Sequence, residues 1–355
     1  MDVFELLRQV LAAGASDLHL VVGVAPSMRL HGDIKPLPFP PLDKPGCDSL
    51  VRSLLHEPQL QVLDRDWQVS VSVELDDPKN GGMLGHFRVS AHLREGAAEA
   101  AIRVTPRRVR SLDELGLPPI LKDLCLRDSG LILITGPTGH GKTTTFNALI
   151  DYINQRKRVK VITIEDPIEY RHQHRHAVIV QLEVGRDTRT FGDALRHALR
   201  EDPDVICVGE MRDLETIATA ITAAETGHLV LATLHTPSAI GTISRIVDVF
   251  PGSQQDQVKI QLANTLTAVV SQRLLPRADG RGRVLATEVL VATDAVRNLI
   301  REQKLHQVHN VMATNRAVGM QRLEDALRFL LEQGTVSRLV ASQAANDVRA
   351  IQDLL

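Results

Sequence analysis

The feature that most constrains the fold is a glycine-rich loop set between a short apolar run and a helix-like segment. The apolar run is LILIT, residues 131–135, and the loop that follows reads GPTGHGKT, residues 136–143. This spacing fits the phosphate-binding pattern GxxxxGK[ST], which requires a strand before the loop and a helix after it. Backbone N–H groups of such a loop turn inward around phosphate oxygens, and the helix N-terminus adds a favourable dipole.

The loop predicts which residues hold the nucleotide. Lys142 is expected to reach the β- and γ-phosphates, and Thr143 to offer its hydroxyl to Mg²⁺. A chance match in a glycine turn is the alternative, and the sequence on both sides argues against it. The predicted nucleotide-binding residues are Gly136, Pro137, Thr138, Gly139, His140, Gly141, Lys142, Thr143 and Thr144.

The region around the loop alternates strand-like and helix-like segments. Apolar runs at 159–165, 205–209 and 229–234 predict further buried strands, and 191–201 and 213–227 predict helices. Such alternation is typical of an α/β fold with a parallel sheet covered by helices. After about residue 239 the pattern predicts mostly helix, with one strand at 283–293.

The first third of the chain has the pattern of a small α+β unit. Apolar residues at helical spacing predict a helix near residues 3–11, and residues 17–22, 69–75, 85–95 and 97–106 predict strands. A basic, turn-rich stretch then separates this unit from the rest. The predicted organisation is a domain at 1–104, a linker at 105–112 and a second domain at 113–355.

Acidic residues follow two of the predicted parallel strands. Glu165, Asp166 and Glu169 end the segment VITIEDPIEY, and Glu210 follows VICVG. Ligands gather at the carboxyl ends of parallel strands, where carboxylates hold Mg²⁺ or activate water. Glu210 is the candidate for activating water, and the sequence leaves a metal role for it open as well. Glu169 and Asp213 are as well explained as exposed loop acids.

Histidine and arginine side chains are the remaining candidates. His235 follows the run 229–234 at a strand end that should lie beside the phosphate loop, where its ring can donate to the γ-phosphate. A cation on the transferred phosphoryl group is a common requirement, and a neighbouring subunit can supply it. Arg88, Arg94 and Arg103 lie on predicted strands of the first unit, and the residues alone do not select among them or exclude ordinary surface arginines.

Composition excludes several classes of protein. The net charge of −2 and the lack of a concentrated basic, aromatic-bearing stretch disfavour a nucleic-acid partner, including a ring motor on DNA. The three cysteines form no CxxC pair, which indicates a reducing compartment rather than disulfides or zinc. Neither a signal-peptide pattern nor an apolar run of membrane-spanning length is expected, so the predicted location is cytoplasmic.

Four ordered segments together resemble the ATPases of the type II secretion and type IV pilus superfamily, and most closely their PilT branch of pilus retraction ATPases. The segments are ITGPTGHGKTTT, VITIEDPIEY, REDPDVICVGEMRDLETIATAITAAETGHLVLATLHT and DAVRNLIRE. The resemblance covers nearly the whole chain. It implies a PAS-like N-terminal domain, a RecA-like P-loop ATPase domain with a helical C-terminal part, and a hexameric ring that binds ATP and Mg²⁺.

The resemblance also implies roles for individual residues. Glu210, Glu165 and His235 are the implied catalytic residues, joined by Arg88 and Arg103, which match the family's nucleotide-reaching arginines in spacing. The implied Mg²⁺ ligands are Thr143, Glu165 and Glu210, and the implied histidine motif contains His228 as well as His235.

The implied activity is a motor that powers pilus retraction and twitching motility by nucleotide-driven domain rotation. Implied partners are identical subunits and an inner-membrane pilus platform protein, with a paralogous retraction ATPase as a candidate, and the implied place is the cytoplasmic side of the inner membrane at the pilus base. The alternative is a PilU-like accessory paralogue or a low-activity nucleotide-binding partner. One departure from the family pattern is His140, where Ser is usual, and an imidazole there predicts pH-sensitive activity.

Overall fold

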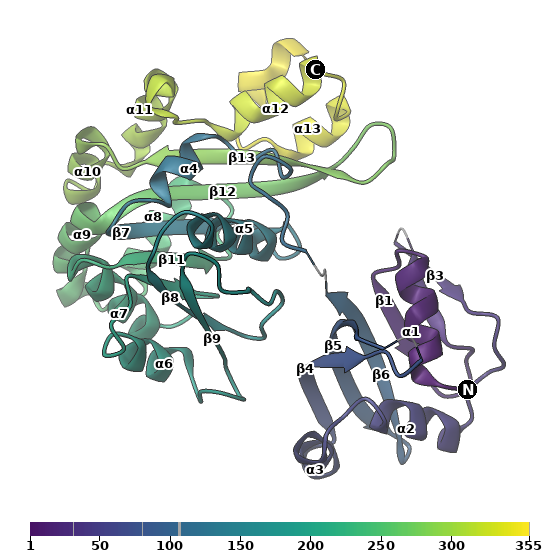
Figure 1. Ribbon diagram of the computed structural model, residues 1–355. Helices are drawn as coiled ribbons and strands as arrows, with labels where there is room; N and C mark the ends of the chain where they lie inside the picture. The colour runs from purple at the N-terminus through teal and green to yellow at the C-terminus, as the bar shows by residue number, and fades with distance from the viewer. Residues whose placement is uncertain (31, 80, 106–107, 355) are drawn as a thin grey trace. The chain divides into compact units, whose positions relative to one another are not determined.

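The computed structural model describes residues 1–30, 32–79, 81–105 and 108–354 (Figure 1). The chain divides into two compact units. The first contains Met1–Arg108 and Pro167–Arg171, and the second contains Val109–Asp166 and His172–Leu355. Residues 106 and 107 of the predicted linker, and residue 355 of the predicted second domain, lie outside the described residues.

In its described residues, the first unit is an antiparallel sheet with three helices, in agreement with the predicted α+β pattern. The sheet order is β3-β2-β1-β6-β5-β4. The strands are β1 (Asp17–Leu20), β2 (Ser27–Leu30), β3 (Asp33–Pro36), β4 (Gln68–Asp76), β5 (Met83–Arg94) and β6 (Ala97–Thr105). The helices are α1 (Val3–Ala12), α2 (Lys44–Arg52) and α3 (Glu57–Asp66).

Helix α1 shows why the first unit folds as it does. Asp2 caps its N-terminus by accepting from the N–H of Phe4, which satisfies a backbone donor that the helix itself leaves unpaired. Leu6, Leu7 and Val10 recur at helical spacing and are fully buried. They form the core of this unit with apolar residues of the sheet such as Phe87.

The second unit is built on a seven-stranded sheet in the order β13-β12-β7-β11-β10-β8-β9. Neighbouring strands are parallel except for the antiparallel pair β12–β13. The α/β fold class with a parallel sheet is therefore confirmed. The strands are β7 (Gly130–Thr135), β8 (Lys160–Glu165), β9 (Val178–Glu183), β10 (Val205–Val208), β11 (Leu229–Leu234), β12 (Leu266–Pro276) and β13 (Arg283–Val291).

Helices of the second unit pack on this sheet and continue beyond it. None of the helices in the described part of the chain is long and apolar enough to cross a membrane. They are α4 (Ile120–Leu124), α5 (Lys142–Asn154), α6 (Phe191–Ala198), α7 (Leu214–Glu225), α8 (Ala239–Asp248), α9 (Gly252–Thr265), α10 (Asp294–Arg301), α11 (Val308–Thr314), α12 (Leu323–Glu332) and α13 (Arg338–Ala344), with short 3₁₀ turns η1 (Leu305–Gln307), η2 (Arg316–Val318) and η3 (Val348–Leu354).

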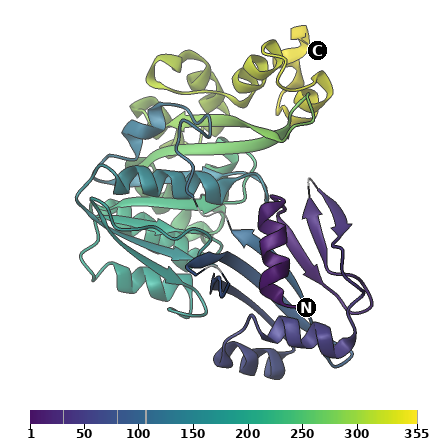
Figure 2. The same cartoon turned by 45° about the vertical axis from the view of Figure 1, so that its right-hand side comes forward.

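The prediction of mostly helix after residue 239 was wrong at β12. This strand is the neighbour of β7, and both views show it beside β13 as a long antiparallel pair (Figures 1 and 2). Its sequence LTAVVSQRLLP mixes polar and apolar residues without alternation, because its first seven residues are buried on both faces. Strand β9 was not predicted either. It lies at the edge of the sheet, where partly exposed residues weaken the apolar pattern.

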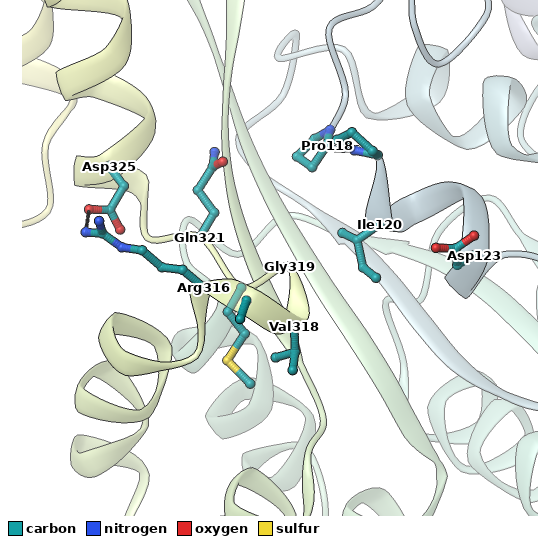
Figure 3. A pocket seen from close by; sticks show the side chains of 11 residues that line it. Pro118, Ile120, Asp123, Arg316, Val318, Gly319, Gln321 and Asp325 are labelled. Atoms are coloured by element: carbon teal, nitrogen blue, oxygen red, sulfur yellow. Dashed lines mark hydrogen bonds and ion pairs between the residues drawn. The ribbon is translucent and has the colours of Figure 1, made fainter.

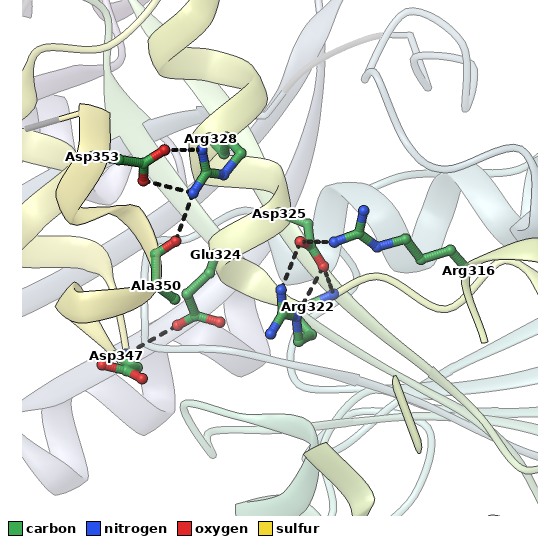
Figure 4. A network of polar contacts seen from close by, with 8 residues as sticks. All are labelled: Arg316, Arg322, Glu324, Asp325, Arg328, Asp347, Ala350 and Asp353. Atoms are coloured by element: carbon green, nitrogen blue, oxygen red, sulfur yellow. Dashed lines mark hydrogen bonds and ion pairs between the residues drawn. The ribbon is translucent and has the colours of Figure 1, made fainter. Parts of the chain in front are cut away.

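The C-terminal part packs as a small helical layer with its own apolar core, which contains Leu323, Leu327 and Ile351. Polar contacts hold the end of the chain to α12 (Figure 4). Glu324 accepts from the N–H groups of Asn346 and Asp347, both at 3.0 Å. Arg328 forms an ion pair with Asp353 at 2.7 Å. Residues 336–354 are thus part of the folded unit.

Candidate nucleotide site

The sheet order brings the predicted site residues to one edge of the second unit. Strands β7, β11, β10 and β8 are consecutive neighbours in the sheet and all parallel. Their carboxyl ends lead into the phosphate loop, His235, Glu210 and Glu165, in that spatial order. Because carboxyl ends of parallel strands meet at the same edge, residues up to about a hundred positions apart gather there.

Glycines shape the loop between β7 and α5. Gly136 has a φ of +141°, and a Cβ atom at this position would overlap the carbonyl oxygen of Gln272 on β12. Gly141, immediately before α5, has a φ of +82°. Only glycine adopts these angles freely and allows the close approach to β12. The loop therefore delivers its backbone to the N-terminus of α5, where N–H groups bind anions.

Lys142 is buried and lies across the loop. Its Nζ donates to the carbonyl oxygens of Gly136 (2.8 Å) and Pro137 (3.0 Å) and is 3.3 Å from Nδ1 of His235. Burial lowers the pKa of this lysine, and the charge of Glu210 partly offsets that effect. The ammonium group is thus held at the strand ends, next to the other predicted site residues.

Glu210 and His235 are in direct contact. Oε1 of Glu210 lies 2.9 Å from Nε2 of His235, and Arg212 approaches both carboxylate oxygens at 2.6 Å. Burial raises the pKa of Glu210, but the hydrogen bond from Arg212 and the nearby His235 outweigh it and leave the pKa below its usual value. These three residues and Arg245 line a hollow of about 320 Å³. An ionised carboxylate is therefore present where a water molecule can enter.

His235 links the lysine to the acid. Its Nδ1 faces Lys142 and the hydroxyl of Thr138 (3.2 Å), and its Nε2 faces Glu210. Since the ammonium group can only donate, we assign the ring proton to Nε2, from which it donates to the carboxylate. The predicted role of His235 as a γ-phosphate donor is not tested by these contacts, but its place beside the loop is as expected.

Glu165 ends β8 and is nearly completely buried. Its Oε1 accepts from the hydroxyl of Thr163 (2.7 Å) and from the side-chain amide of Gln181 (3.1 Å). A glycine precedes Glu210 because β8 and β10 are close here: a Cβ atom on Gly209 would lie 3.0 Å from the carbonyl oxygen of Ile164. The two carboxylates thus follow adjacent strands.

The donor set at this edge suits Mg²⁺. Thr143, Glu165 and Glu210 offer one hydroxyl and two carboxylates, and Mg²⁺ typically binds one or two carboxylates together with substrate phosphates. The described residues contain no group of three or more His, Cys, Asp or Glu side chains that could hold a metal alone. The arrangement therefore fits a metal that arrives with a nucleotide better than a permanent metal centre.

His140 is directed toward β12. Its Nδ1 accepts from the backbone N–H of Leu274 (3.0 Å), and its carbonyl oxygen accepts from the side chain of Gln272 (2.7 Å). Burial lowers the pKa of His140, and the charges of Arg273, Lys142 and Arg283 lower it further. The ring is therefore neutral at pH 7 and serves as a contact between the loop and the sheet.

The predicted arginines Arg88 and Arg103 lie in the first unit, side by side. They are register partners on β5 and β6, and Arg103 is also the partner of Asp17 on β1, with which it forms an ion pair at 3.0 Å. Glu169 belongs to the same unit. Burial raises the pKa of Glu169, and the two arginines oppose this. Arg94 instead pairs with the buried Glu99 at 2.8 Å.

Other polar residues named from the sequence have structural positions. Asp213 caps α7 by accepting from the N–H of Thr216 (2.8 Å). His228 lies at the opposite end of β11 from His235, and its Nδ1 contacts the carbonyl oxygen of Ala223 (2.9 Å). Arg212 was missed by the sequence analysis, although its position two residues after Glu210 is a signal. Gln272 was missed because β12 itself was missed.

A larger hollow of about 530 Å³ lies elsewhere in the second unit, between the start of α4 and the segment around η2 (Figure 3). Its charged lining consists of Asp123 and the ion pair of Arg316 with Asp325 (2.5 Å). None of the residues predicted for catalysis or nucleotide binding lines it. It is therefore separate from the site at the strand ends.

Comparison with known proteins agrees with this geometry. The family model of the type II/IV secretion system proteins matches residues 82–342. The chain belongs to this family. The match covers the β5–β6 arginines, the phosphate loop, both acidic strand ends and His235.

Two relatives match over almost the full length. The chain is 43% identical to the "Type IV pilus retractation ATPase PilT" of Pseudomonas aeruginosa over 97% of this chain and 98% of that protein. It is 42% identical to a "Twitching motility protein" of Neisseria gonorrhoeae over 98% of this chain and 91% of that protein. The crystal structure of the pilus retraction motor PilT with bound ADP superposes with a TM-score of 0.91 and 46% identity, and covers 99% of each chain.

Proposed function

We propose that this protein is an ATPase motor that powers retraction of type IV pili. The observation that carries the proposal is the contact chain from Lys142 through His235 to Glu210 at the end of adjacent parallel strands. It joins a phosphate-binding lysine to an ionised acid. The full-length similarity to a pilus retraction ATPase supports the specific process.

The residues divide the work of ATP hydrolysis. The loop amides and the N-terminus of α5 hold the phosphates, and Lys142 exchanges its contacts with the carbonyls of Gly136 and Pro137 for phosphate oxygens. Glu210 orients the attacking water and accepts its proton. The water oxygen forms a bond to the γ-phosphorus as the bond to the bridging oxygen of ADP breaks. His235 donates from Nε2 to Glu210 and contacts Lys142 through Nδ1. It therefore couples the position of the acid to that of the lysine.

The proposed metal ligands are Thr143, Glu165 and Glu210. Bound Mg²⁺ would neutralise charge on the β- and γ-phosphates. Glu165 is preset for this role because Thr163 and Gln181 both donate to its Oε1 and fix the carboxylate. Glu210 is proposed both to bind the metal and to activate water, and the test below therefore measures Glu210→Gln with and without Mg²⁺.

The proposed assembly is a hexameric ring, in which Arg88 and Arg103 of one subunit serve the nucleotide of its neighbour. Rotation of the two units with nucleotide state would perform the mechanical work. The proposed partner is a pilus platform protein of the inner membrane, to which the ring would bind from the cytoplasm. We propose the domains predicted at 1–104 and 113–355 as the two rotating bodies.

The decisive measurement is the steady-state ATPase rate of assembled rings with and without Mg²⁺, for the native protein and Glu210→Gln. We expect Mg²⁺-dependent turnover in the native rings and a loss of roughly 10²-fold or more in kcat for the variant, with nucleotide affinity retained. Assembled native rings that bind ATP without turnover would instead indicate an accessory protein of the same family.

A further inference from the structure

A continuous chain of hydrogen bonds connects the first turn of α5 to Glu165. Asn147 donates from Nδ2 to the carbonyl oxygen of Thr143 (2.9 Å), and its Oδ1 lies 2.7 Å from Nε2 of His172. The backbone N–H of His172 donates to Oε1 of Gln181 (2.9 Å). The side-chain amide of Gln181 then donates to Oε1 of Glu165 (3.1 Å). We call Asn147, His172 and Gln181 the His172 bridge.

The direction of each hydrogen bond in the bridge is determined by its neighbours. The amide nitrogen of Asn147 faces a carbonyl, so its oxygen faces the imidazole and Nε2 of His172 must carry a proton. Burial lowers the pKa of His172 to about 4; Arg175 lowers it as well, and Asp151 opposes this. The ring is therefore neutral at pH 7 and holds a single proton, which is used in the bond to Asn147.

Gln181 is oriented in the same way. Its carbonyl oxygen accepts from the backbone of His172, so its NH₂ group faces Glu165. Thr163 donates to the same oxygen of Glu165 at 2.7 Å. Two donors on one carboxylate oxygen restrict rotation of the group, because turning it would break both hydrogen bonds.

The bridge also occupies a particular place in the chain. Glu165 and His172 flank the segment Pro167–Arg171, which belongs to the first unit, and His172 is the first residue that belongs to the second unit again. Asn147 is fully buried, so loss of its hydrogen bond to His172 would leave its Oδ1 atom without that donor. Because the backbone N–H of His172 donates to Gln181, a shift of His172 would also change the bond that leads to Glu165.

We propose that His172 is a positioning residue, which through Asn147 and Gln181 fixes the Glu165 carboxylate relative to Thr143. The inference rests on the proposed function, in which these two residues are Mg²⁺ ligands. Partners that orient metal ligands from outside typically change metal affinity or activity by about 10–100-fold when they are removed.

The test compares His172→Phe with His172→Gln. The Phe variant keeps an aromatic ring but removes the donor to Asn147, and we expect kcat to fall by roughly 10–100-fold and the Mg²⁺ concentration for half-maximal activity to rise. The Gln variant places an amide N–H near the position of the ring Nε2–H and should restore most of both values. His174→Phe is the matched control, because His174 accepts from the N–H of Ile179 and is not one of the three residues of the bridge.

A second readout does not depend on turnover. The affinity for fluorescent ADP is measured in EDTA and in excess Mg²⁺, and we expect His172→Phe to lose the gain in affinity that Mg²⁺ confers while retaining the affinity in EDTA. Gln181→Met breaks the bridge at its other link and should give the same pattern. This second variant keeps the test decisive if His172→Phe does not fold.

The outcomes separate this inference from the proposed function. Folded variants with native kcat and a native Mg²⁺ effect on ADP binding overturn the bridge. Variants that lose only thermal stability, with native kcat for each assembled ring, overturn it as well, since they show a purely structural role. Absence of Mg²⁺-dependent turnover in the native protein overturns the proposed function, and the ADP measurement still decides the bridge.

Discussion

At the scale of single residues, His140 shows how one side chain can change its expected role. The sequence placed an imidazole next to phosphate and predicted pH-sensitive activity. In the structure the ring instead accepts from the N–H of Leu274, a residue of β12 that lies beyond the last pairing of this strand with β7. The imidazole thus satisfies a backbone donor that no longer has a strand partner on that side.

Replacing His140 with Ser should therefore change stability more than binding. We expect His140→Ser to lower the free energy of unfolding by about 1–2 kcal/mol, because the N–H of Leu274 loses its acceptor. Nucleotide affinity should stay within a few-fold, since the loop binds through its backbone. Denaturant unfolding and ADP titration of the variant measure the two effects. A large loss of affinity at unchanged stability would contradict this assignment.

His172 should make folding sensitive to acid. Its pKa is lowered from 6.5 to about 4, so below pH 6.5 the unfolded chain binds a proton that the native protein does not. Above pH 6.5, His172 is neutral in both states and does not lower the free energy of unfolding. As the pH falls from 6.5 toward 4, protonation of His172 in the unfolded chain lowers that free energy. Between pH 7 and pH 5 the native protein should lose about 2 kcal/mol more unfolding free energy than His172→Gln. Equal losses in urea titrations at the two pH values would refute the assignment.

At the scale of secondary-structure elements, the end of β7 and the middle of β12 determine the shape of the loop. Gly136 leaves β7 against the carbonyl of Gln272, and the side chain of Gln272 reaches the carbonyl of His140. Strand β12, which was not predicted from the sequence, therefore packs against the phosphate loop, which was.

Two alanine substitutions compare a crowded glycine of the loop with an open one. Gly136→Ala, at a φ of +141°, adds a methyl group that overlaps β12, whereas Gly139→Ala, at a φ of +79°, has no atom within 4 Å of the new methyl group. We expect Gly139→Ala to cost about 1 kcal/mol of unfolding free energy and Gly136→Ala about 2–3 kcal/mol or more. Thermal unfolding of both variants measures the difference. Equal losses would show that β12 can move away.

The elements predicted correctly are those whose pattern is local. Strands β7, β10 and β11 are short apolar runs with every residue buried, and α1 has a regular apolar stripe. Strands β12 and β9 lack such a pattern, because the neighbours that bury them come from distant parts of the chain. The site followed the same rule: Glu165, Glu210 and His235 were found at strand ends, whereas Arg212, Gln181 and His172 became significant only through their contacts.

At the scale of the whole molecule, the proposed function brings arginines of the first unit of one subunit to the nucleotide of its neighbour. Arg88 and Arg103 are adjacent cations on the sheet of the first unit, with Asp17 and Glu169 as the nearby acids. Two cations directly opposite each other on a sheet repel, so a nearby anion stabilises the pair. A transferred phosphoryl group has the charge to fulfil that role.

Mixing two inactive variants tests whether Arg88 acts on a neighbouring subunit. Arg88→Ala rings should lose roughly 10³-fold in kcat, and Glu210→Gln rings roughly 10²-fold or more. If arginine and acid meet across a subunit boundary, each site of a closed ring combines Glu210 of one subunit with Arg88 of its neighbour. In rings co-assembled at equal proportions, half of the subunits have each intact residue, so about a quarter of the sites should regain activity. The ATPase rate of rings reassembled from the mixture measures this. Mixed rings as inactive as the separate variants would place both groups in one subunit.

The sequence by itself determined the phosphate loop, the acids that follow β8 and β10, and the class of fold, because each depends on residues that are close together in the chain. The tertiary structure alone decided which side chains meet: the sheet order sets His235 between Lys142 and Glu210. It also turned His140 toward β12. Hydrogen bonds between distant residues depend on a few tenths of an ångström, and only the packed sheet fixes positions that closely.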